Sequence, residues 1–297
     1  MPSAKVFPVM LTPFHGDRSI DYAALEKLIA WYEEKGVDGL FAVCQSSEMF
    51  FLSLEERVAL AKFVKEHAHV PVVASGHIAD ALDGQAYELA AMADTGVDAV
   101  ILLTNRFCGQ FDGSNAWLAA FDKLLAKLPD VPLGLYECPY PYKWVLSDKE
   151  LAYAASTGRF RFLKDTCCDA KRIRGRLEIL RGTGLELYNA NTATLLDSVR
   201  AGAAGYSGVM ANIHPELYKK LLAAPDAPGA ELLQAQLTMC ALIERQCYPV
   251  NAKYYLEGEG VPMTRICRTR DAHELTETYR SEMEQLRLLT ADLNRRF

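Results

Sequence analysis

The sequence lacks the features that mark several large classes of protein. It contains no block of lysine and arginine, and its formal net charge of −6 argues against a nucleic-acid or anionic-membrane partner. It contains no uninterrupted run of about 18 apolar residues, so no membrane span is expected. Residues 1–14 lack a long apolar segment followed by a cleavage site, so we expect no signal peptide and a cytoplasmic location.

The eight cysteines form no CxxC pair and show no Cys/His spacing typical of zinc sites. Without an export signal, reduced thiols are expected, and the adjacent pair Cys167-Cys168 receives no role. Neither GxGxxG nor the Walker lysine motif is present, which argues against nucleotide binding. We therefore expect neither a metal ion nor another cofactor.

The 297 residues are 50% hydrophobic and 24% charged, which fits a soluble chain with a sizeable core. Short apolar runs of strand length alternate with amphipathic segments of helix length. We predict strands at residues 6–11, 38–43, 70–74, 99–103, 132–136, 161–164, 186–188 and 204–207, and helices that include 21–34, 54–66, 83–94, 115–127 and 148–155. Such alternation is typical of a parallel sheet that is covered on its outer face.

The joints between helices and strands share a glycine. Gly36, Gly96 and Gly202 each follow a helical segment and precede a strand. Glycine fits the left-handed position that ends a helix because it has no Cβ to clash. This repeated joint, with eight strand–helix units, favours a closed (β/α)8 TIM barrel over an open doubly wound sheet. We place the barrel at residues 1–225 and a helical extension packed on it at 226–297, with helices at 230–247 and 274–294.

Lys164 is the first candidate for a catalytic residue. Chemistry in a barrel of this kind occurs at the carboxyl ends of the strands, and Lys164 ends the apolar run FRFLK at residues 160–164. Burial there would lower the pKa of the amine and supply the neutral form that attacks a carbonyl group. The alternatives are a lysine that is paired with Asp165 or directed out of the barrel.

Tyr136 ends the preceding strand, so adjacent strands would direct Tyr136 and Lys164 to the same mouth. A phenol can protonate the hydroxide that leaves a carbinolamine and can later take a proton back. Its ordinary pKa of about 10 matches an amine and an alkoxide better than a carboxylate would. The alternative is an ordinary tyrosine at a wet rim.

The loop after the second strand, CQSSE at residues 44–48, is rich in hydrogen-bond donors. The hydroxyls of Ser46 and Ser47, together with several backbone N–H groups, can hold a substrate carboxylate without a cation. Small polar residues are common in loops, so this loop indicates a carboxylate site only in combination with Lys164 and Tyr136.

With these elements in place, the sequence resembles the dihydrodipicolinate synthase / N-acetylneuraminate lyase family of class I aldolases over nearly the whole chain. PVMLTPF at 8–14 is similar to the family's first strand, and CQSSE at 44–48 lies where the family has Gly-Thr/Ser-Thr-Gly-Glu. YECP at 136–139 lies at the motif Tyr-Asn-x-Pro, and LKDT at 163–166 lies at the lysine motif, 28 residues further on. GYSGVMAN at 205–212 and YPVNAK at 248–253 resemble the eighth strand and a segment of the C-terminal helices.

The resemblance implies that Lys164 forms an imine with pyruvate or a related 2-oxo acid and that Tyr136 shuttles protons. Ser46 and Ser47 would hold the carboxylate, and the backbone around Ser207 would face the bound pyruvyl group. The protonated imine is an electron sink, so a C–C bond can break or form through an enamine, or β-elimination can follow. The resemblance also implies that no metal is required and that the chain forms a homo-oligomer, a tetramer or a dimer.

Several positions depart from the family pattern. Cys44 and Ser47 replace the two glycines of the second-strand motif, and Gln45 stands where dihydrodipicolinate synthases have the threonine that links their tyrosines. Phe107 lacks the hydroxyl of the tyrosine that those enzymes contribute across a dimer. The arginine expected shortly after Tyr136 is absent from YPYK at 140–143, so no guanidinium fork is available for a second carboxylate. True dihydrodipicolinate synthase activity is therefore not expected.

The substrate stays open at this point. NANT at 189–192 lacks the acidic pair expected of sialic acid lyases, while Arg106, Glu137 and Lys143 are candidates for contacting the substrate, with surface charge as the alternative. The leading hypothesis is a Schiff-base aldolase or lyase that acts on pyruvate or a small hydroxy-2-oxo acid. The alternatives are a Schiff-base dehydratase or deaminase of a 2-oxo-3-deoxy sugar acid or related compound, and a non-catalytic 2-oxo-acid-binding protein on the same scaffold.

Overall fold

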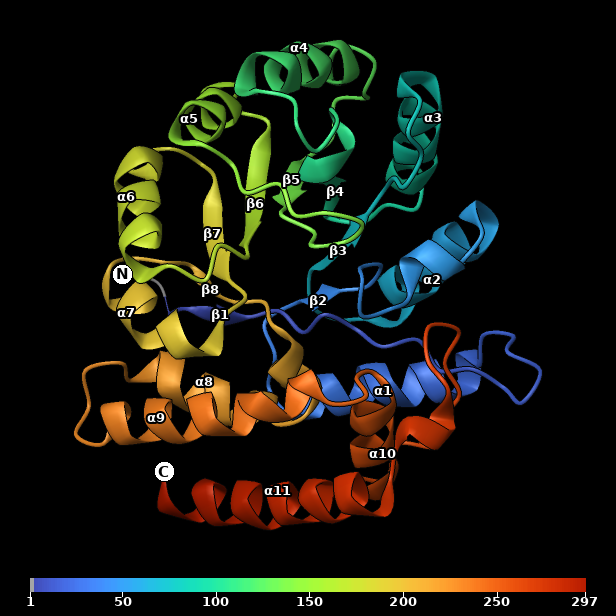
Figure 1. Ribbon diagram of the computed structural model, residues 1–297, viewed down its shortest axis with the longest axis vertical. Helices are drawn as coiled ribbons and strands as arrows, with labels where there is room; N and C mark the ends of the chain where they lie inside the picture. The colour runs from blue at the N-terminus through green and yellow to red at the C-terminus, as the bar shows by residue number, and fades with distance from the viewer. Residues whose placement is uncertain (1–2) are drawn as a thin grey trace.

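The computed structural model describes residues 3–297, in which eight parallel strands form one curled sheet (Figure 1). The strands are β1 (Lys5–Val6), β2 (Leu40–Phe41), β3 (Val72–Ser75), β4 (Ala99–Leu103), β5 (Leu133–Tyr136), β6 (Phe160–Asp165), β7 (Glu186–Asn189) and β8 (Gly205–Tyr206). β1 pairs with β8, and a parallel bridge between Val9 and Phe41 joins the two ends of the sheet. The sheet is therefore closed, which confirms the predicted (β/α)8 barrel.

A helix follows each strand and covers the outside of the barrel. These helices are α1 (Tyr22–Glu34), α2 (Leu54–His67), α3 (Leu82–Ala93), α4 (Ser114–Leu125), α5 (Asp148–Ser156), α6 (Ala170–Leu180), α7 (Leu195–Arg200) and α8 (Pro215–Ala223). Three more helices, α9 (Ala230–Cys240), α10 (Val250–Gly258) and α11 (Glu277–Arg296), lie on the side of the barrel that carries α1 and α8 (Figure 1). None of the described helices is long and apolar enough to cross a bilayer.

Local sequence signals explain several of the element boundaries. Gly36, Gly96 and Gly202 have φ angles of 77°, 78° and 104°, as predicted for glycines that end helices. At the start of α2, the Ser53 side chain accepts from the Glu56 N–H while the Glu56 carboxylate accepts from the Ser53 N–H. This capping box satisfies two backbone donors that the helix itself leaves free.

Most predicted helices and strands differ from the structure by one or two residues at their ends, and a few differ by more. The helix predicted at 230–247 ends at Cys240 and gives way to a 3-10 turn, in which the Ile243 carbonyl accepts from the Gln246 N–H at 3.2 Å and from the Asn251 side chain at 3.0 Å. The last helix starts three residues later than predicted, where Thr276 caps it. The regular pairing of β1, β2 and β8 spans only two residues each, and Pro8 has no N–H with which to extend β1.

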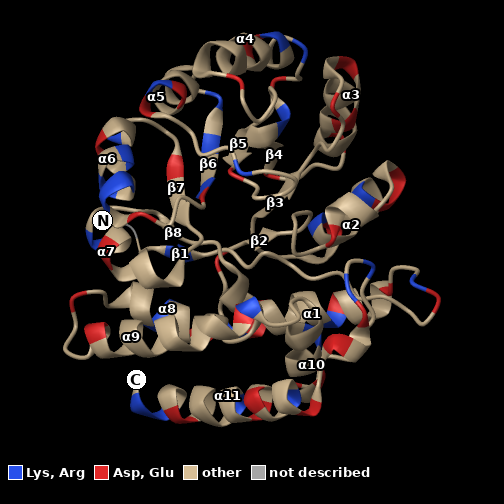
Figure 2. Cartoon of the chain, viewed as in Figure 1, with Lys and Arg blue, Asp and Glu red and all other residues tan. Residues whose placement is uncertain are grey.

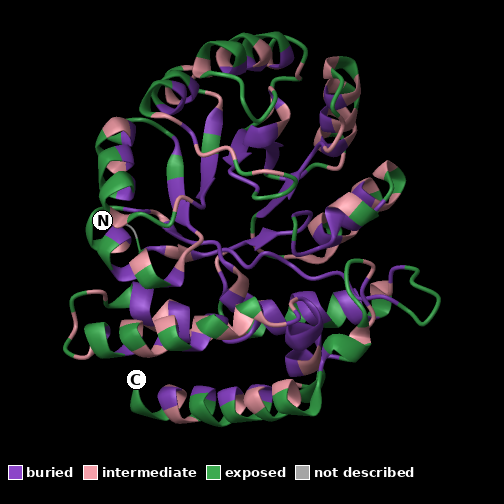
Figure 3. Ribbon diagram, in the orientation of Figure 1, coloured by how far each residue is buried: buried purple, intermediate pink, exposed green. Residues whose placement is uncertain are grey.

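Burial and charge divide the molecule between the barrel and its helices. The strands are mostly buried and the outer faces of the helices are exposed (Figure 3). Lysine, arginine, aspartate and glutamate lie mainly on helices and loops (Figure 2). Inside the barrel, Phe162 stacks on Tyr188 with ring centroids 4.4 Å apart, and Phe7 and Phe41 pack against Phe162 at 5.5 and 5.9 Å. This aromatic layer is a rigid floor below the carboxyl ends of the strands.

Candidate active site

Lys164 and Tyr136 are neighbours across two adjacent strands. The two residues are paired in the register of β5 and β6, and the Nζ atom of Lys164 lies 4.4 Å from the centroid of the Tyr136 ring. The same nitrogen lies 5.6 Å from the centroid of the Phe41 ring. Both side chains are nearly buried, at 5% and 3% exposure. The alternative pairing of Lys164 with Asp165 is wrong, because Asp165 is bound to Arg176.

The surroundings set the protonation of both groups. Burial lowers the pKa of the Lys164 amine to about 8, and only the thiols of Cys44 and Cys138 and the carboxylate of Glu244 act in the opposite direction. Burial, with a smaller contribution from the two thiols, raises the pKa of the Tyr136 phenol well above its ordinary value. At neutral pH the phenol is therefore a proton donor beside an amine that readily becomes neutral.

A cavity of about 740 Å³ opens at the carboxyl ends of the strands and contains both groups in its wall. Its other walls come from the loop after β2, from the ends of β6 and β8, and from the residues that join α9 to α11. Besides Lys164 and Tyr136, its polar lining includes Gln45, Ser46, Thr166, Glu244, Arg245, Tyr248, Thr269 and Arg270. Aromatic side chains of Phe50, Phe51 and Tyr140 line the mouth.

The loop at 44–48 presents its three predicted site residues differently. Gln45 and Ser46 line the cavity, and Gln45 also accepts a hydrogen bond from Cys138 Sγ at 3.8 Å. The Ser47 hydroxyl closes its own loop, since it accepts from the Cys44 N–H and donates to the Cys44 carbonyl, both at 2.7 Å. Among residues 3–297, the backbone N–H groups of Ser46 and Ser47 donate to no backbone carbonyl, and the acceptor beside them is the weakly accepting thiol of Cys44. Amide donors with so weak a partner suit a carboxylate.

The segment after β8 also reaches the cavity. Gly208 and Val209 line it, whereas the Ser207 hydroxyl is buried without a hydrogen-bond partner among the described residues. The Ser207 N–H donates to the Asn189 carbonyl at 2.9 Å, which continues the β7–β8 ladder. In this segment the cavity wall is therefore formed by the two residues after Ser207 and not by Ser207 itself.

Comparison with known proteins identifies the family of the chain. The model of the dihydrodipicolinate synthetase family matches residues 2–288. The chain belongs to this family. Its members are class I lyases that use a lysine Schiff base, as the resemblance in the sequence implied. The 4-hydroxy-tetrahydrodipicolinate synthases of Shewanella sp. (strain ANA-3) and Shewanella baltica (strain OS155 / ATCC BAA-1091) are each 29% identical over 226 residues, which is 75% of this chain and 75% of theirs.

Solved structures of the dihydrodipicolinate synthetase family share the fold. The chloride-inhibited dihydrodipicolinate synthase from Acinetobacter baumannii, complexed with pyruvate, has a TM-score of 0.85 at 24% identity and covers 98% of this chain and 99% of its own. A prophage protein of the family from E. coli K12, in complex with pyruvate, has a TM-score of 0.84 at 20% identity, with 99% of both chains covered.

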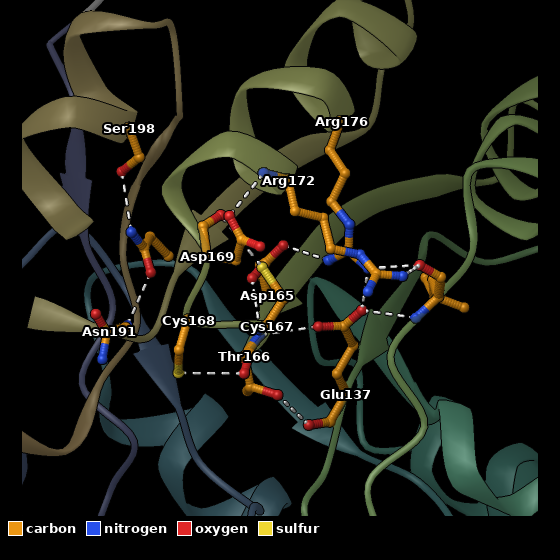
Figure 4. Close-up of polar contacts among 12 residues, drawn as sticks. Glu137, Asp165, Thr166, Cys167, Cys168, Asp169, Arg172, Arg176, Asn191 and Ser198 are labelled. Atoms are coloured by element: carbon orange, nitrogen blue, oxygen red, sulfur yellow. Dashed lines mark hydrogen bonds and ion pairs between the residues drawn. The ribbon is translucent and has the colours of Figure 1, made fainter. Parts of the chain in front are cut away.

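The three charged candidates Arg106, Glu137 and Lys143 do not line the cavity. Arg106 pairs with Asp80 at 2.6 Å, and the exposed Lys143 donates to the Thr166 carbonyl. Glu137 is neither a surface charge nor a substrate contact, because it is fully buried and bound to Arg176 (Figure 4). The expectation for Glu137 was wrong because its N–H still donates to the Lys164 carbonyl of β6 at 3.3 Å, so the backbone stays extended and the Glu137 side chain faces the side opposite to that of Tyr136.

The sequence did not identify the cavity residues of the C-terminal extension. Glu244, Arg245, Thr269 and Arg270 come from a 3-10 turn and a loop, where surface charge is the ordinary interpretation. Tyr248 lies in a recognised motif, but nothing in its pattern indicated that it would reach the cavity. No group of three or more potential metal ligands is arranged around a common point in residues 3–297.

A buried ion pair holds this extension against the loop after β2. Glu48 Oε1 lies 3.1 Å from Lys253 Nζ, and both side chains are essentially inaccessible to solvent. Glu48 Oε2 accepts from the backbone N–H groups of Arg268 and Thr269 at 2.6 and 2.8 Å. Thr269, which lines the cavity from the extension, is thereby fixed to the same loop that carries Ser46.

Proposed function

We propose that this protein is a Schiff-base lyase or aldolase that acts on pyruvate or a small hydroxy-2-oxo acid, with Lys164 as the nucleophile and Tyr136 as the proton relay. The observation that carries the proposal is the buried Lys164 amine, with its pKa lowered to about 8, whose nitrogen lies 4.4 Å from the Tyr136 ring centroid. Attack on a ketone requires a neutral amine, and burial from water with a lowered pKa supplies it.

The chemistry follows from the positions of these groups. The neutral Lys164 amine adds to the 2-oxo carbon, and Tyr136 protonates the hydroxide that leaves the carbinolamine as water. The resulting iminium accepts the electron pair of the bond that breaks at the next carbon, which gives an enamine. Ser46, through its hydroxyl and amide, and Ser47, through its amide, hold the substrate carboxylate, while Gln45 and the backbone at 207–209 confine the substrate.

Two features argue against 4-hydroxy-tetrahydrodipicolinate synthase activity. Phe107 has no hydroxyl, and its ring is buried against Trp117 with centroids 4.8 Å apart. The segment at 140–143 supplies no guanidinium for a second carboxylate. We therefore expect no detectable synthesis of 4-hydroxy-tetrahydrodipicolinate. Family membership also supports a cytoplasmic homo-oligomer, a tetramer or a dimer, which sedimentation of the purified protein would measure.

Borohydride trapping tests the proposal directly. With pyruvate and borohydride, the peptide that contains Lys164 should gain the mass of pyruvic acid less one oxygen atom, and Lys164→Met should abolish this adduct. If several 2-oxo acids leave Lys164 unmodified, the chain is a binding protein and not an enzyme of this class. Product analysis then separates the two enzymatic outcomes, because a lyase releases pyruvate and a dehydratase releases water without shortening the carbon chain.

The same trapping assay tests Tyr136. Tyr136→Phe should retain the fold and slow adduct formation by about 100-fold, within the range for loss of a general acid. An unchanged rate would remove Tyr136 from the mechanism. Tyr153→Phe is a matched control, because Tyr153 lies exposed on α5 and its hydroxyl donates to Asp122 outside the cavity.

A further inference from the structure

A buried cluster of three charges includes the residues that directly follow the two reacting side chains in the sequence, and Figure 4 shows this cluster. Glu137 follows Tyr136 at the end of β5, Asp165 follows Lys164 in β6, and Arg176 projects from α6. All three side chains are fully buried. The proposed chemistry above assigns no role to any of them.

The alternation of side chains along a strand explains this arrangement. Tyr136 and Lys164 face the cavity, so the next residues, Glu137 and Asp165, face the opposite side, where α6 packs. There the Arg176 guanidinium donates to Glu137 Oε1 at 2.6 Å through Nη2 and to Asp165 Oδ2 through Nη1. One planar group therefore holds the ends of two adjacent strands.

Further hydrogen bonds tie this cluster to the cavity wall. Glu137 Oε2 accepts from the Thr166 N–H at 2.9 Å, and the Thr166 hydroxyl donates to the Glu137 carbonyl at 2.8 Å. Thr166 itself lines the cavity. Arg176 Nη2 also donates to the Leu146 carbonyl at 2.7 Å, while the Leu146 N–H donates to Glu137 Oε1 at 2.9 Å. The loops that follow β5 and β6 are thus held by the same contacts as the strand ends.

The guanidinium is indispensable to the charge balance of the cluster. Burial alone would lower the pKa of Arg176, but the Glu137 and Asp165 carboxylates outweigh burial and raise it. Without Arg176, two carboxylates would face each other in a site that excludes water, and they would separate or take up protons. Either response would displace the residues that precede them, Tyr136 and Lys164.

We propose that Arg176 is a positioning residue that sets the separation of the Lys164 amine and the Tyr136 phenol by fixing Glu137 and Asp165. This inference rests on the proposed function, because the separation matters through imine formation. Arg176 touches neither the cavity nor the reacting groups. Its effect is therefore expected on the rate of adduct formation and not on the affinity for the 2-oxo acid.

The test compares Arg176→Met with Arg57→Met. Arg57 in α2 is also buried, at 2% exposure, and pairs with Glu88 of α3 at 2.7 Å, but it contacts neither β5 nor β6. Removal of either guanidinium leaves a carboxylate without its partner, so both variants report the loss of a buried ion pair. Only Arg176→Met removes the link between the two strand ends. Each variant is measured for thermal midpoint and for the rate of borohydride trapping over a range of pyruvate concentrations.

We expect Arg176→Met to lower the maximal trapping rate by about tenfold or more, with a nearly unchanged half-saturating pyruvate concentration, because small displacements of reacting groups cost large factors in rate. Arg57→Met should keep the maximal rate of the parent protein whatever its thermal midpoint. Arg176→Lys restores the charge but not the fork and should recover only part of the rate. If Arg176→Met and Arg57→Met retain the same maximal rate, Arg176 serves the fold alone and the proposal fails.

Two further measurements keep the inference testable. If Arg176→Met does not fold, the triple variant Arg176→Met, Glu137→Gln, Asp165→Asn removes the unbalanced charges, and it should fold while keeping the slow trapping rate. If the parent protein forms no pyruvate adduct, the proposed function fails first. The position of Lys164 is then followed by competitive acetylation against pH and peptide mapping. An apparent pKa of Lys164 that is the same in the parent and in Arg176→Met would overturn the positioning role.

Discussion

At the scale of single residues, the activity proposed here depends on the burial of the Lys164 amine and on the pKa that burial produces. Burial lowers the pKa of Lys164 to about 8 from the ordinary 10.5 of a lysine. Below that pKa the side chain is an ammonium, which has no lone pair with which to attack a ketone. The position of the pKa therefore decides the pH range in which the amine is a nucleophile.

We predict that the rate of imine formation rises with pH through about 8 and levels off above it. An unperturbed lysine, whose ordinary pKa is 10.5, would give a rate that continues to rise up to about pH 10.5. Borohydride trapping that is stopped at timed intervals, followed by mapping of the Lys164 peptide, measures the rate of adduct formation at each pH. A profile without a plateau below pH 10 would show that the amine is well solvated and not buried.

Neighbouring residues in the sequence differ in how far their roles could be predicted. Lys164 and Tyr136 could be identified because each ends an apolar run, and the ends of barrel strands meet at one mouth. Ser47 and Glu137 could not be placed, because one residue along the chain turns a side chain away from the cavity. Only the backbone conformation decides which of two adjacent polar residues faces the cavity.

At the scale of elements, closure of the barrel depends on the contact between β1 and β8. Gly205 in β8 pairs with Lys5 in β1, and a Cβ atom at Gly205 would overlap the backbone carbonyl of Lys5. The two strands can approach only because this position has no side chain. A backbone carbonyl cannot move aside as a flexible side chain can.

We predict that Gly205→Ala lowers the free energy of unfolding by about 3 kcal/mol or more, because the strands must separate to admit the methyl group. Gly175→Ala is the matched control. Gly175 is exposed in α6 with no atom near its ideal Cβ position, so alanine there should raise stability by about 0.5–1 kcal/mol. Urea unfolding measures both, and equal stability of the two variants would contradict the closure argument.

The elements of the barrel were predicted more accurately than those of the extension. β4 has the predicted bounds of 99–103, because its apolar run is continuous and bounded on both sides by polar residues. The helix predicted at 230–247 changes to a 3-10 turn after Cys240, and the Ile243 carbonyl accepts from the Asn251 side chain, for which the apolar pattern carries no signal. Side-chain contacts and packing override helical periodicity.

At the scale of the whole molecule, the cavity needs parts of the chain that are far apart in the sequence. The Glu48–Lys253 pair joins the loop after β2 to α10 and to the loop that carries Thr269 and Arg270. A buried ion pair is costly to form, but it is costlier still to lose one partner of it. Our proposed boundary between residues 225 and 226, in the link from α8 to α9, therefore separates two parts that share one site.

We predict that Lys253→Met lowers the free energy of unfolding by about 3–5 kcal/mol, because the Glu48 carboxylate stays buried without its cation. The double variant Lys253→Met, Glu48→Gln should recover much of this loss. In the exposed pair Lys62–Glu66, Lys62→Met should change stability by less than about 1 kcal/mol. Urea unfolding of the four proteins, including the parent, checks the order, and a loss in Lys253→Met no larger than in Lys62→Met would contradict it.

The walls of the cavity have different origins. Lys164 and Tyr136 belong to strands that also hold the barrel together. Other residues of the wall lie on segments outside the sheet, namely Glu244, Arg245, Thr269 and Arg270. Evolution or design can therefore change the cavity-lining residues at 244–245 and 269–270, and so change which molecules enter, while Lys253 keeps its pairing with Glu48 and the amine and the phenol keep their places. Relatives that share the chemistry but act on different substrates are expected to differ most at these positions.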